Sequence, residues 1–228
     1  TMPIAIRELA EMFLKDPATV SVSPVSSTAE KVEQRIYFVD KTEKRNLLYH
    51  LIRNEKLSDV LVFSRTKHGA DNVVKALRKH GVAAEAIHGD KSQTARQRVL
   101  DAFKRKEVGV LVATDIAARG IDIDLLPYVV NFDLPNIPET YVHRIGRTGR
   151  AGSTGIAISF CSKDEAPYWK DIQKLIKVDV QTISDHPYPW HEGSEEAAAE
   201  PPKNSNRSGG AHKSRKSTNS KQNKKRWY

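Results

Sequence analysis

The sequence predicts an α/β fold, in which a parallel sheet carries helices on both of its faces. The first observation behind this prediction is that short apolar runs alternate with helix-like stretches from residue 34 onward. The second is that most of these runs lack a regular alternation of polar and apolar residues, which is typical of strands buried on both faces. Strands that alternate with helices in this way indicate a parallel sheet wrapped by helices.

Six strands are expected along the chain. They are QRIYFV (34–39), DVLVF (59–63), VAAEAI (82–87), GVLVA (109–113), YVVNF (128–132) and TGIAISF (154–160).

Helix start signals lie between these runs. Asp40 and Glu43 have the spacing of a capping box before LLYHLI, and Ser162 and Glu165 have it before a helix expected at 164–176. Pro138 suits the first turn of another helix. Apolar stripes predict the core-facing sides of two further helices, at Val73, Val74 and Leu77 and at Val99, Leu100 and Phe103.

The domain organisation follows from where this pattern starts and stops. Residues 1–33 are expected to hold the end of a preceding domain, with a helix at 1–14, followed by a linker that is rich in Pro, Ser and Thr. Residues 34–183 would form the α/β domain. The proline-broken stretch DHPYPWHEG opens an extension at 184–228 that we expect to be disordered, first acidic and then basic.

The net charge of +9 is not spread evenly over the chain. Residues 203–228 hold nine Lys and Arg and no acid, whereas residues 192–200 hold four Glu and no base. The rest of the chain is therefore only mildly basic. A tail of this composition has little to bury and can neutralise nucleic-acid phosphates without reading sequence.

Two further features bear on location. No apolar run reaches the roughly 18 residues that a membrane helix needs, so no membrane association is expected. A single cysteine, Cys161, rules out an internal disulfide framework and suits a reducing compartment. A cytoplasmic protein is therefore expected.

Polar residues cluster where the predicted strands end, which is where ligands gather in open parallel sheets. The stretches are SRTKHGAD, HGDKSQTARQR, TDIAARGID and HRIGRTGR. They would place five arginines on one rim: Arg65, Arg96, Arg119, Arg147 and Arg150. Forked guanidinium groups and glycine-flanked backbone amides suit phosphate oxygens.

These stretches resemble a known family. LVFSRTK, HGD followed by QTAR, ATDIAARGID and YVHRIGRTGR are similar, in order and spacing, to motifs IV, IVa, V and VI of the second RecA-like domain of DEAD-box RNA helicases. The resemblance covers roughly residues 1–176, and the opening TMP is similar to the end of the family's Ser-Ala-Thr motif with its continuation. NFDLPNIPETYVHR and the basic tail suggest bacterial RhlE-like members.

The resemblance implies roles for individual residues. Arg147 and Arg150 would reach the ATP phosphates, with Arg150 as the arginine finger, while Gly120 and Asp122 would lie at the nucleotide and Asp122 would bond the ribose. His143 and Arg144 would link to the acidic motif of the N-terminal RecA-like domain. The remaining residues would contact RNA: Arg65, Gly89, Gln93, Arg96, Thr114 and Arg119.

The chain contains neither a G-x-x-x-x-G-K-[ST] loop nor an Asp-Glu-Ala-Asp sequence. ATP and Mg²⁺ would therefore be held mainly by the N-terminal RecA-like domain, and no metal site is expected in this chain. The parent protein would be an ATP-dependent helicase that unwinds or remodels short RNA duplexes, whereas this fragment alone would be inactive.

Other interpretations stay open at this point. The chain could be a self-sufficient RNA-binding module whose tail does most of the binding, or a flavodoxin-like nucleotide-binding domain, which would need no arginine pair. Among single residues, His143 could be a core histidine, and Asp115 is expected only to order its own loop. Tyr168 and Trp169 are expected to pack rather than to stack on bases.

Overall fold

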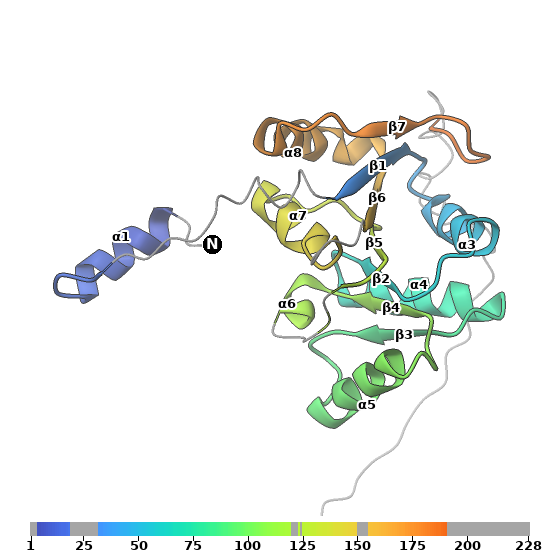
Figure 1. Ribbon diagram of the computed structural model, residues 1–228, viewed down its shortest axis with the longest axis horizontal. Helices are drawn as coiled ribbons and strands as arrows, with labels where there is room; N and C mark the ends of the chain where they lie inside the picture. Colours follow the sequence, from blue (N-terminus) through green and yellow to red (C-terminus); the bar gives the residue numbers. More distant parts are fainter. Residues whose placement is uncertain (1–3, 19–31, 120–122, 124, 150–154, 191–228) are drawn as a thin grey trace, which may run out of the picture. The chain divides into compact units, whose positions relative to one another are not determined.

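The computed structural model describes residues 4–18, 32–119, 123, 125–149 and 155–190. Within this part of the chain, seven parallel strands form one sheet in the order β3-β4-β2-β5-β6-β1-β7 (Figure 1). The strands are β1 (Glu33–Phe38), β2 (Val60–Phe63), β3 (Ala84–Ile87), β4 (Val110–Ala113), β5 (Tyr128–Asn131), β6 (Ile156–Cys161) and β7 (Gln181–Ile183). The predicted α/β fold with a parallel sheet is confirmed, and each of the six predicted runs contains a strand.

Helices occupy the segments between the strands. They are α1 (Ile4–Phe13), α3 (Lys44–Asn54), α4 (Lys67–Lys79), α5 (Gln93–Lys104), α6 (Asp115–Ala118), α7 (Pro138–Ile145), the 3₁₀ turn η1 (Lys163–Glu165) and α8 (Ala166–Ile176). None of the helices in the described part of the chain is long and apolar enough to cross a membrane.

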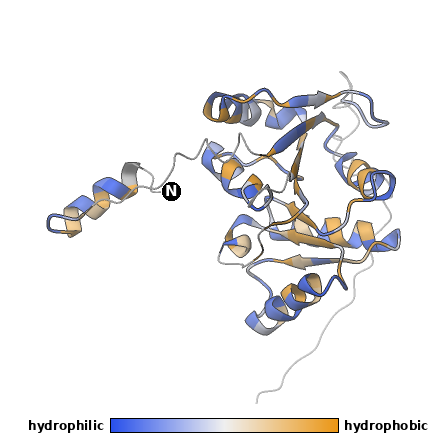
Figure 2. Ribbon diagram, in the orientation of Figure 1, coloured by the Kyte–Doolittle hydropathy of each residue, from blue (hydrophilic) through white to orange (hydrophobic). Residues whose placement is uncertain are grey.

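The sheet separates two layers of helices. Alternate residues of β2 point to opposite faces, so that Val60 and Val62 pack with α3 and α4, whereas Leu61 and Phe63 pack with α5 and α6. Helices α7 and α8 lie on the same face of the sheet as α5 and α6, where they cover β1 and β6. In Figure 2 the strands at the centre of the sheet are largely hydrophobic, as burial on both faces requires.

The two predicted capping boxes have different outcomes. Ser162 and Glu165 form one, in which each side chain meets the backbone N–H of the other residue. The prediction for Asp40 and Glu43 is wrong. The helix α3 begins at Lys44, so that Glu43 rather than Asp40 is its N-cap residue, and the Glu43 side chain makes no cap and instead accepts from Asn46 Nδ2.

The end of the fold also differs from the prediction. Residues 181–183 form the edge strand β7, and the chain then turns so that residues 189 and 190 meet the end of β1 in the antiparallel direction. Pro189 bridges to Val39, the backbone N–H of Trp190 donates to Phe38 O at 3.3 Å, and Tyr188 packs against the core. The extension expected from residue 184 therefore begins with a described segment, residues 184–190, in which His186, Tyr188, Pro189 and Trp190 contact the domain. Its acidic and basic parts lie outside the described residues.

Candidate functional site

The carboxyl ends of β2, β3, β4 and β5 bring the predicted residues to one edge of the sheet. All strands are parallel, so the segments that begin at Ser64, His88, Thr114 and Phe132 follow the strands at the same edge. Three of these segments lead directly into helices, with Thr66, Ser92 and Thr114 as the N-cap residues of α4, α5 and α6. Gly120, Asp122 and Arg150 lie outside the described residues.

Arg144 lies inside the domain. Only 2% of its side chain is exposed, and its Nε and Nη2 donate to the two carboxylate oxygens of Asp115 at 2.6 and 2.8 Å. Its Nη1 donates to Asp133 O at 2.6 Å and to Asn131 Oδ1 at 3.3 Å, and the guanidinium carbon lies 5.0 Å from the centre of the Phe63 ring. A buried arginine that is paired this completely joins α7 to α6 and to the end of β5.

This geometry changes the expected role of Arg144. The resemblance implied that it links to a partner domain, but its fork is enclosed by groups of its own domain, and we therefore assign it an internal role. Asp115, which was expected only to order its own loop, is its bidentate partner. The two residues are 29 positions apart, and nothing in the local sequence indicates that they pair.

His143 follows Val142 and precedes Arg144 on α7, but unlike both neighbours it is exposed. Tyr141, Val142 and Ile145 are buried on the same helix, whereas His143 is exposed, so the interpretation as a core histidine is wrong. Partial burial, together with the positive charges of Arg119 and Arg147, lowers the pKa of His143 below its ordinary value. Arg119 and Arg147 thus act electrostatically on the imidazole, which is mostly uncharged at neutral pH.

The segment that carries Arg147 is fixed by its backbone. Arg147 O accepts from Leu126 N at 3.2 Å, and the buried Thr148 hydroxyl donates to Leu126 O. Gly155 lies against the same threonine, and a Cβ there would clash with Thr148 Oγ1. The close packing of Leu126, Thr148 and Gly155 sets where the half-buried Arg147 can lie.

The first turn of α5 brings Gln93 and Arg96 together, because they lie three residues apart on the helix. Arg96 Nη1 donates to Gln93 Oε1 at 3.1 Å and its Nη2 lies 3.5 Å from Ala117 O, next to α6. Gly89, just before this helix, is exposed, and a Cβ there would meet nothing within 4 Å. This backbone is therefore open to close approach by a ligand.

The loop between β3 and α5 is tied to α4 by two ion pairs. Lys67 Nζ lies 2.8 Å from Asp90 Oδ2, and Lys91 Nζ lies 3.2 Å from Asp71 Oδ1. His88 is buried beneath the loop, with Nε2 3.2 Å from Asp71 Oδ1 but too poorly aligned for a hydrogen bond, and its backbone O accepts from Lys91 N in a turn. His88 therefore shapes this turn from below.

Arg65 is held at one end of its guanidinium group. Its Nη2 donates to Glu165 Oε1 at 2.8 Å and to Leu134 O at 2.9 Å, and its guanidinium carbon lies 5.3 Å from the centre of the Tyr168 ring. Tyr168 therefore packs, as expected, but its neighbour is a predicted RNA-binding arginine. Glu165 was predicted only as a capping residue, and sequence reasoning missed its contact with Arg65.

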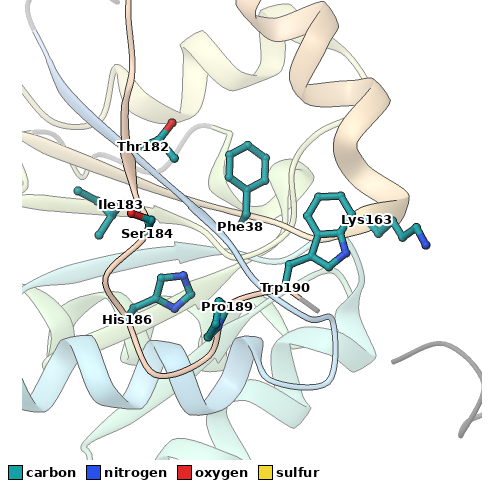
Figure 3. A pocket seen from close by; sticks show the side chains of 8 residues that line it. All are labelled: Phe38, Lys163, Thr182, Ile183, Ser184, His186, Pro189 and Trp190. Atoms are coloured by element: carbon teal, nitrogen blue, oxygen red, sulfur yellow. The ribbon is translucent and has the colours of Figure 1, made fainter. Parts of the chain in front are cut away.

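A separate hollow of about 320 Å³ lies beside β7 (Figure 3). Phe38, Ile183, Pro189 and Trp190 give it an apolar lining, with Lys163, Thr182, Ser184 and His186 completing the lining residues. None of the predicted site residues lines it, so we place the candidate site at the strand ends. Among the described residues, no group of three His, Cys, Asp or Glu side chains is arranged to hold a metal ion.

Comparison with known proteins gives the same result in sequence and in structure. Residues 43–152 match the family described as the helicase conserved C-terminal domain. A DEAD-box ATP-dependent RNA helicase CshA from Geobacillus kaustophilus is 44% identical over 183 residues, which are 80% of this chain but 39% of that protein. The chain thus spans about two fifths of the length of this relative.

Two solved structures are similar over most of the domain. The DEAD-box protein SrmB from E. coli, bound to regulator of ribonuclease activity A, matches 71% of this chain and 96% of its own, with 33% identity and a TM-score of 0.67. S. cerevisiae Dbp5, bound to RNA and ADP BeF3, matches 80% of this chain and 49% of its own, with 30% identity and a TM-score of 0.71. The RhlE-like subgroup stays a prediction. The chain belongs to the DEAD-box RNA helicases and is the C-terminal RecA-like domain of a member of that family.

Proposed function

We propose that this chain is the RNA-gripping and arginine-finger half of an ATP-dependent RNA helicase. In this proposal, residues 34–183 form the second RecA-like domain, and the parent protein unwinds or remodels short RNA duplexes. The observation that carries the proposal is the pair of the buried Arg144 and the partly buried Asp115, which fixes the helix of motif VI against the helix of motif V. The predicted ATP-facing and RNA-facing segments therefore form one rigid unit.

The proposed chemistry at the nucleotide is electrostatic. In phosphoryl transfer the charge spreads over the equatorial oxygens of the transferred group, and an arginine placed against them accelerates the reaction by about 10³ to 10⁵. We assign this role to Arg150, with Arg147 on the neighbouring phosphate and Gly120 and Asp122 at the nucleoside. ATP and Mg²⁺ would be held mainly by the N-terminal RecA-like domain, and His143 would contact that domain from its exposed position on α7.

The proposed RNA contacts lie along the strand ends. Gln93 is the first residue of α5, where backbone N–H groups and the helix dipole favour a phosphate, and Arg96 lies one turn later. Gly89 leaves the backbone before the helix open. Arg65, Thr114 and Arg119 would extend the same path. The similarity to Dbp5, whose structure contains RNA and ADP BeF3, supports an RNA and nucleotide role for this domain.

A second candidate function is a self-sufficient RNA-binding module driven by the tail. The nine Lys and Arg between residues 203 and 228 favour it, because they can neutralise phosphates without a fixed geometry. The two candidates differ in what they require of the domain, since only the helicase half needs the arginines of motif VI.

The single buried thiol Cys161, whose pKa burial raises to about 12, suits a reducing compartment, and we propose a cytoplasmic location.

ATP turnover tests the proposal directly. The chain alone, with saturating RNA, should hydrolyse no ATP above background, and hydrolysis should appear when the N-terminal RecA-like domain of the parent is added. Turnover by the chain alone near 1 s⁻¹, which is ordinary for phosphoryl-transfer enzymes, would show that the site is complete without a partner.

A further inference from the structure

A buried ion pair lies directly behind Arg65. Lys44 from the start of α3 and Glu165 from η1 have side chains that are 2% and 3% exposed, and Lys44 Nζ lies 2.5 Å from Glu165 Oε2. Removing two charges from water costs more than their attraction commonly returns, so a buried pair of this kind adds little net stability. A role in holding neighbouring groups in place is therefore worth testing.

The carboxylate of Glu165 is fixed from several directions. It accepts from Arg65 Nη2 at 2.8 Å, Leu134 N at 3.1 Å, Ser162 N at 3.2 Å and Ser162 Oγ at 3.0 Å, as well as from Lys44. Lys44 is held in turn, because its ammonium group donates to Phe132 O at 2.9 Å and lies 3.6 Å from Asp133 Oδ1. Both members of the pair have fixed positions.

Arg65 receives its orientation from this arrangement. Glu165 and Leu134 O bind Nη2, the Tyr168 ring lies beside the guanidinium plane, and Asp133 accepts from the backbone N–H of Arg65 at 2.8 Å. The arginine side chain is nevertheless 41% exposed, and within the described part of the chain no acceptor is bonded to its Nη1 or Nε. One end of the group is anchored and the rest can donate to a ligand.

We propose that Glu165 and Lys44 are positioning residues that hold Arg65 against an RNA phosphate. The inference rests on the proposed RNA-binding role of Arg65. Glu165 orients the guanidinium group before RNA arrives, which removes part of the entropy cost of ordering a long side chain on binding. Lys44 supplies the counter-charge that keeps the Glu165 carboxylate aimed at Arg65.

The main test is Glu165→Gln in the 228-residue chain, with affinity for a fluorescently labelled oligouridylate measured by anisotropy. A neutral amide holds the guanidinium group less firmly and places an N–H near Lys44, so RNA binding should weaken by about tenfold. Measurement at about 150 mM salt limits the contribution of the basic tail.

Asp164→Asn is the matched control. It removes the same charge at the adjacent position, but Asp164 is 46% exposed and pairs at the surface with Lys41. Asp164 Oδ1 also accepts from Ser162 Oγ at 2.6 Å, and the carbonyl oxygen of an asparagine can keep that hydrogen bond. Non-specific electrostatics predicts that both variants bind RNA slightly more tightly, because both become more positive. Positioning predicts weaker binding for Glu165→Gln alone, and equal affinities of the two variants would overturn the inference.

The same measurement in an Arg65→Ala background separates positioning from general damage. Arg65→Ala should itself weaken binding about tenfold, and adding Glu165→Gln should then change nothing. If Arg65→Ala binds normally, the proposed role of Arg65 fails. If Arg65→Ala weakens binding but Glu165→Gln weakens it equally in both backgrounds, only the positioning inference fails.

A compensated variant serves as the control for loss of folding. Glu165→Gln leaves the Lys44 ammonium buried without a counter-charge, so its thermal midpoint should fall. Lys44→Met combined with Glu165→Gln removes that ammonium and should recover the midpoint while RNA binding stays weak. Affinity that recovered together with the midpoint would show that the weakening came from unfolding, and the inference would be overturned.

Discussion

Arg144 and Arg65 lie near the same strand ends but in opposite circumstances. Arg144 is 2% exposed, and all three nitrogens of its guanidinium group donate to acceptors of its own domain. Arg65 is 41% exposed and is held through Nη2 alone in the described part of the chain. A fully paired arginine joins elements, whereas a half-paired one keeps donors for a ligand. The sequence presents both simply as arginines in family motifs.

The cluster of groups bonded to Arg144 and the cluster of groups bonded to Arg65 meet at Asp133. Its backbone O accepts from Arg144 Nη1 at 2.6 Å, and its carboxylate accepts from Ser64 Oγ at 3.0 Å and from Arg65 N at 2.8 Å. A shift of the helix that carries Arg144 would therefore act on the same residue that supports Arg65. Contact of this kind is compatible with coupling between the two clusters, and substitution can measure its size.

The largest expected effect concerns Arg150, which lies outside the described residues. In the full-length parent, Arg150→Ala should lower kcat by about 10³ or more with a much smaller rise in KM for ATP, because the finger's bond strengthens mainly in the transition state. Steady-state ATP hydrolysis at saturating RNA measures this. Arg65→Ala serves as the contrast and should raise the RNA concentration that is required for half-maximal ATP hydrolysis. Loss of RNA affinity alone in both variants would remove Arg150 from the nucleotide site.

The next effect tests the internal role of Arg144. Arg144→Met should lower the free energy of unfolding by about 3 to 5 kcal/mol, because Asp115 keeps its charge at a partly buried position without its partner. Urea unfolding of the chain measures the loss. Arg105→Met, which breaks a fully exposed pair with Glu107, is the control and should leave stability unchanged. Equal, small losses in the two variants would contradict a structural role for Arg144.

The third prediction contrasts the domain with its tail. Each phosphate neutralised on a single strand contributes about −0.7 to the slope of log K against log salt. If about half of the nine cations in residues 203–228 engage RNA, removal of these residues should make the slope shallower by about 3 units. The remaining domain should still bind RNA, but with lower affinity than the full chain. Filter binding of a short unstructured RNA from about 50 to 300 mM salt measures both slopes. Identical slopes would leave the tail outside RNA binding.

How much was predictable differs between the sheet and the site. Six of the seven strands, including the edge strand β3, were predictable, because burial leaves short apolar runs such as VLVF. The edge strand β7 was not, since its residues Gln181 and Thr182 are exposed and only three residues pair. A short polar strand at the edge of a sheet carries little signal in the sequence.

In the site, local patterns were visible and distant pairs were not. Gln93 and Arg96 meet because they lie three residues apart on a helix, which spacing alone predicts. Arg144 meets Asp115 across 29 residues, and Lys44 meets Glu165 across 121. Such pairs depend on which strands become neighbours, and the order of strands in a sheet cannot be read from any local window. Both long-range charge pairs therefore emerged only from the fold.

The smallest expected effect concerns His143, the exposed counterpart of Arg144 on α7. Partial burial and the charges of Arg119 and Arg147 lower its pKa in the folded protein, so the unfolded chain takes up a proton at a higher pH than the folded chain does. The contribution to stability is fully present above about pH 6.5, begins to be lost below that value, and is lost completely as the pH falls through the lower pKa of the folded protein. His143→Gln should therefore lose less stability than the unsubstituted chain between about pH 7 and 5. His186, whose pKa burial also lowers, would supply part of the loss that remains.

Urea unfolding of His143→Gln and of the unsubstituted chain at several pH values measures the difference, and raised salt should shrink it by screening the arginines. Parallel pH profiles for the two proteins would show that the positive charges of Arg119 and Arg147 are too far away, or too well screened, to act on the imidazole of His143.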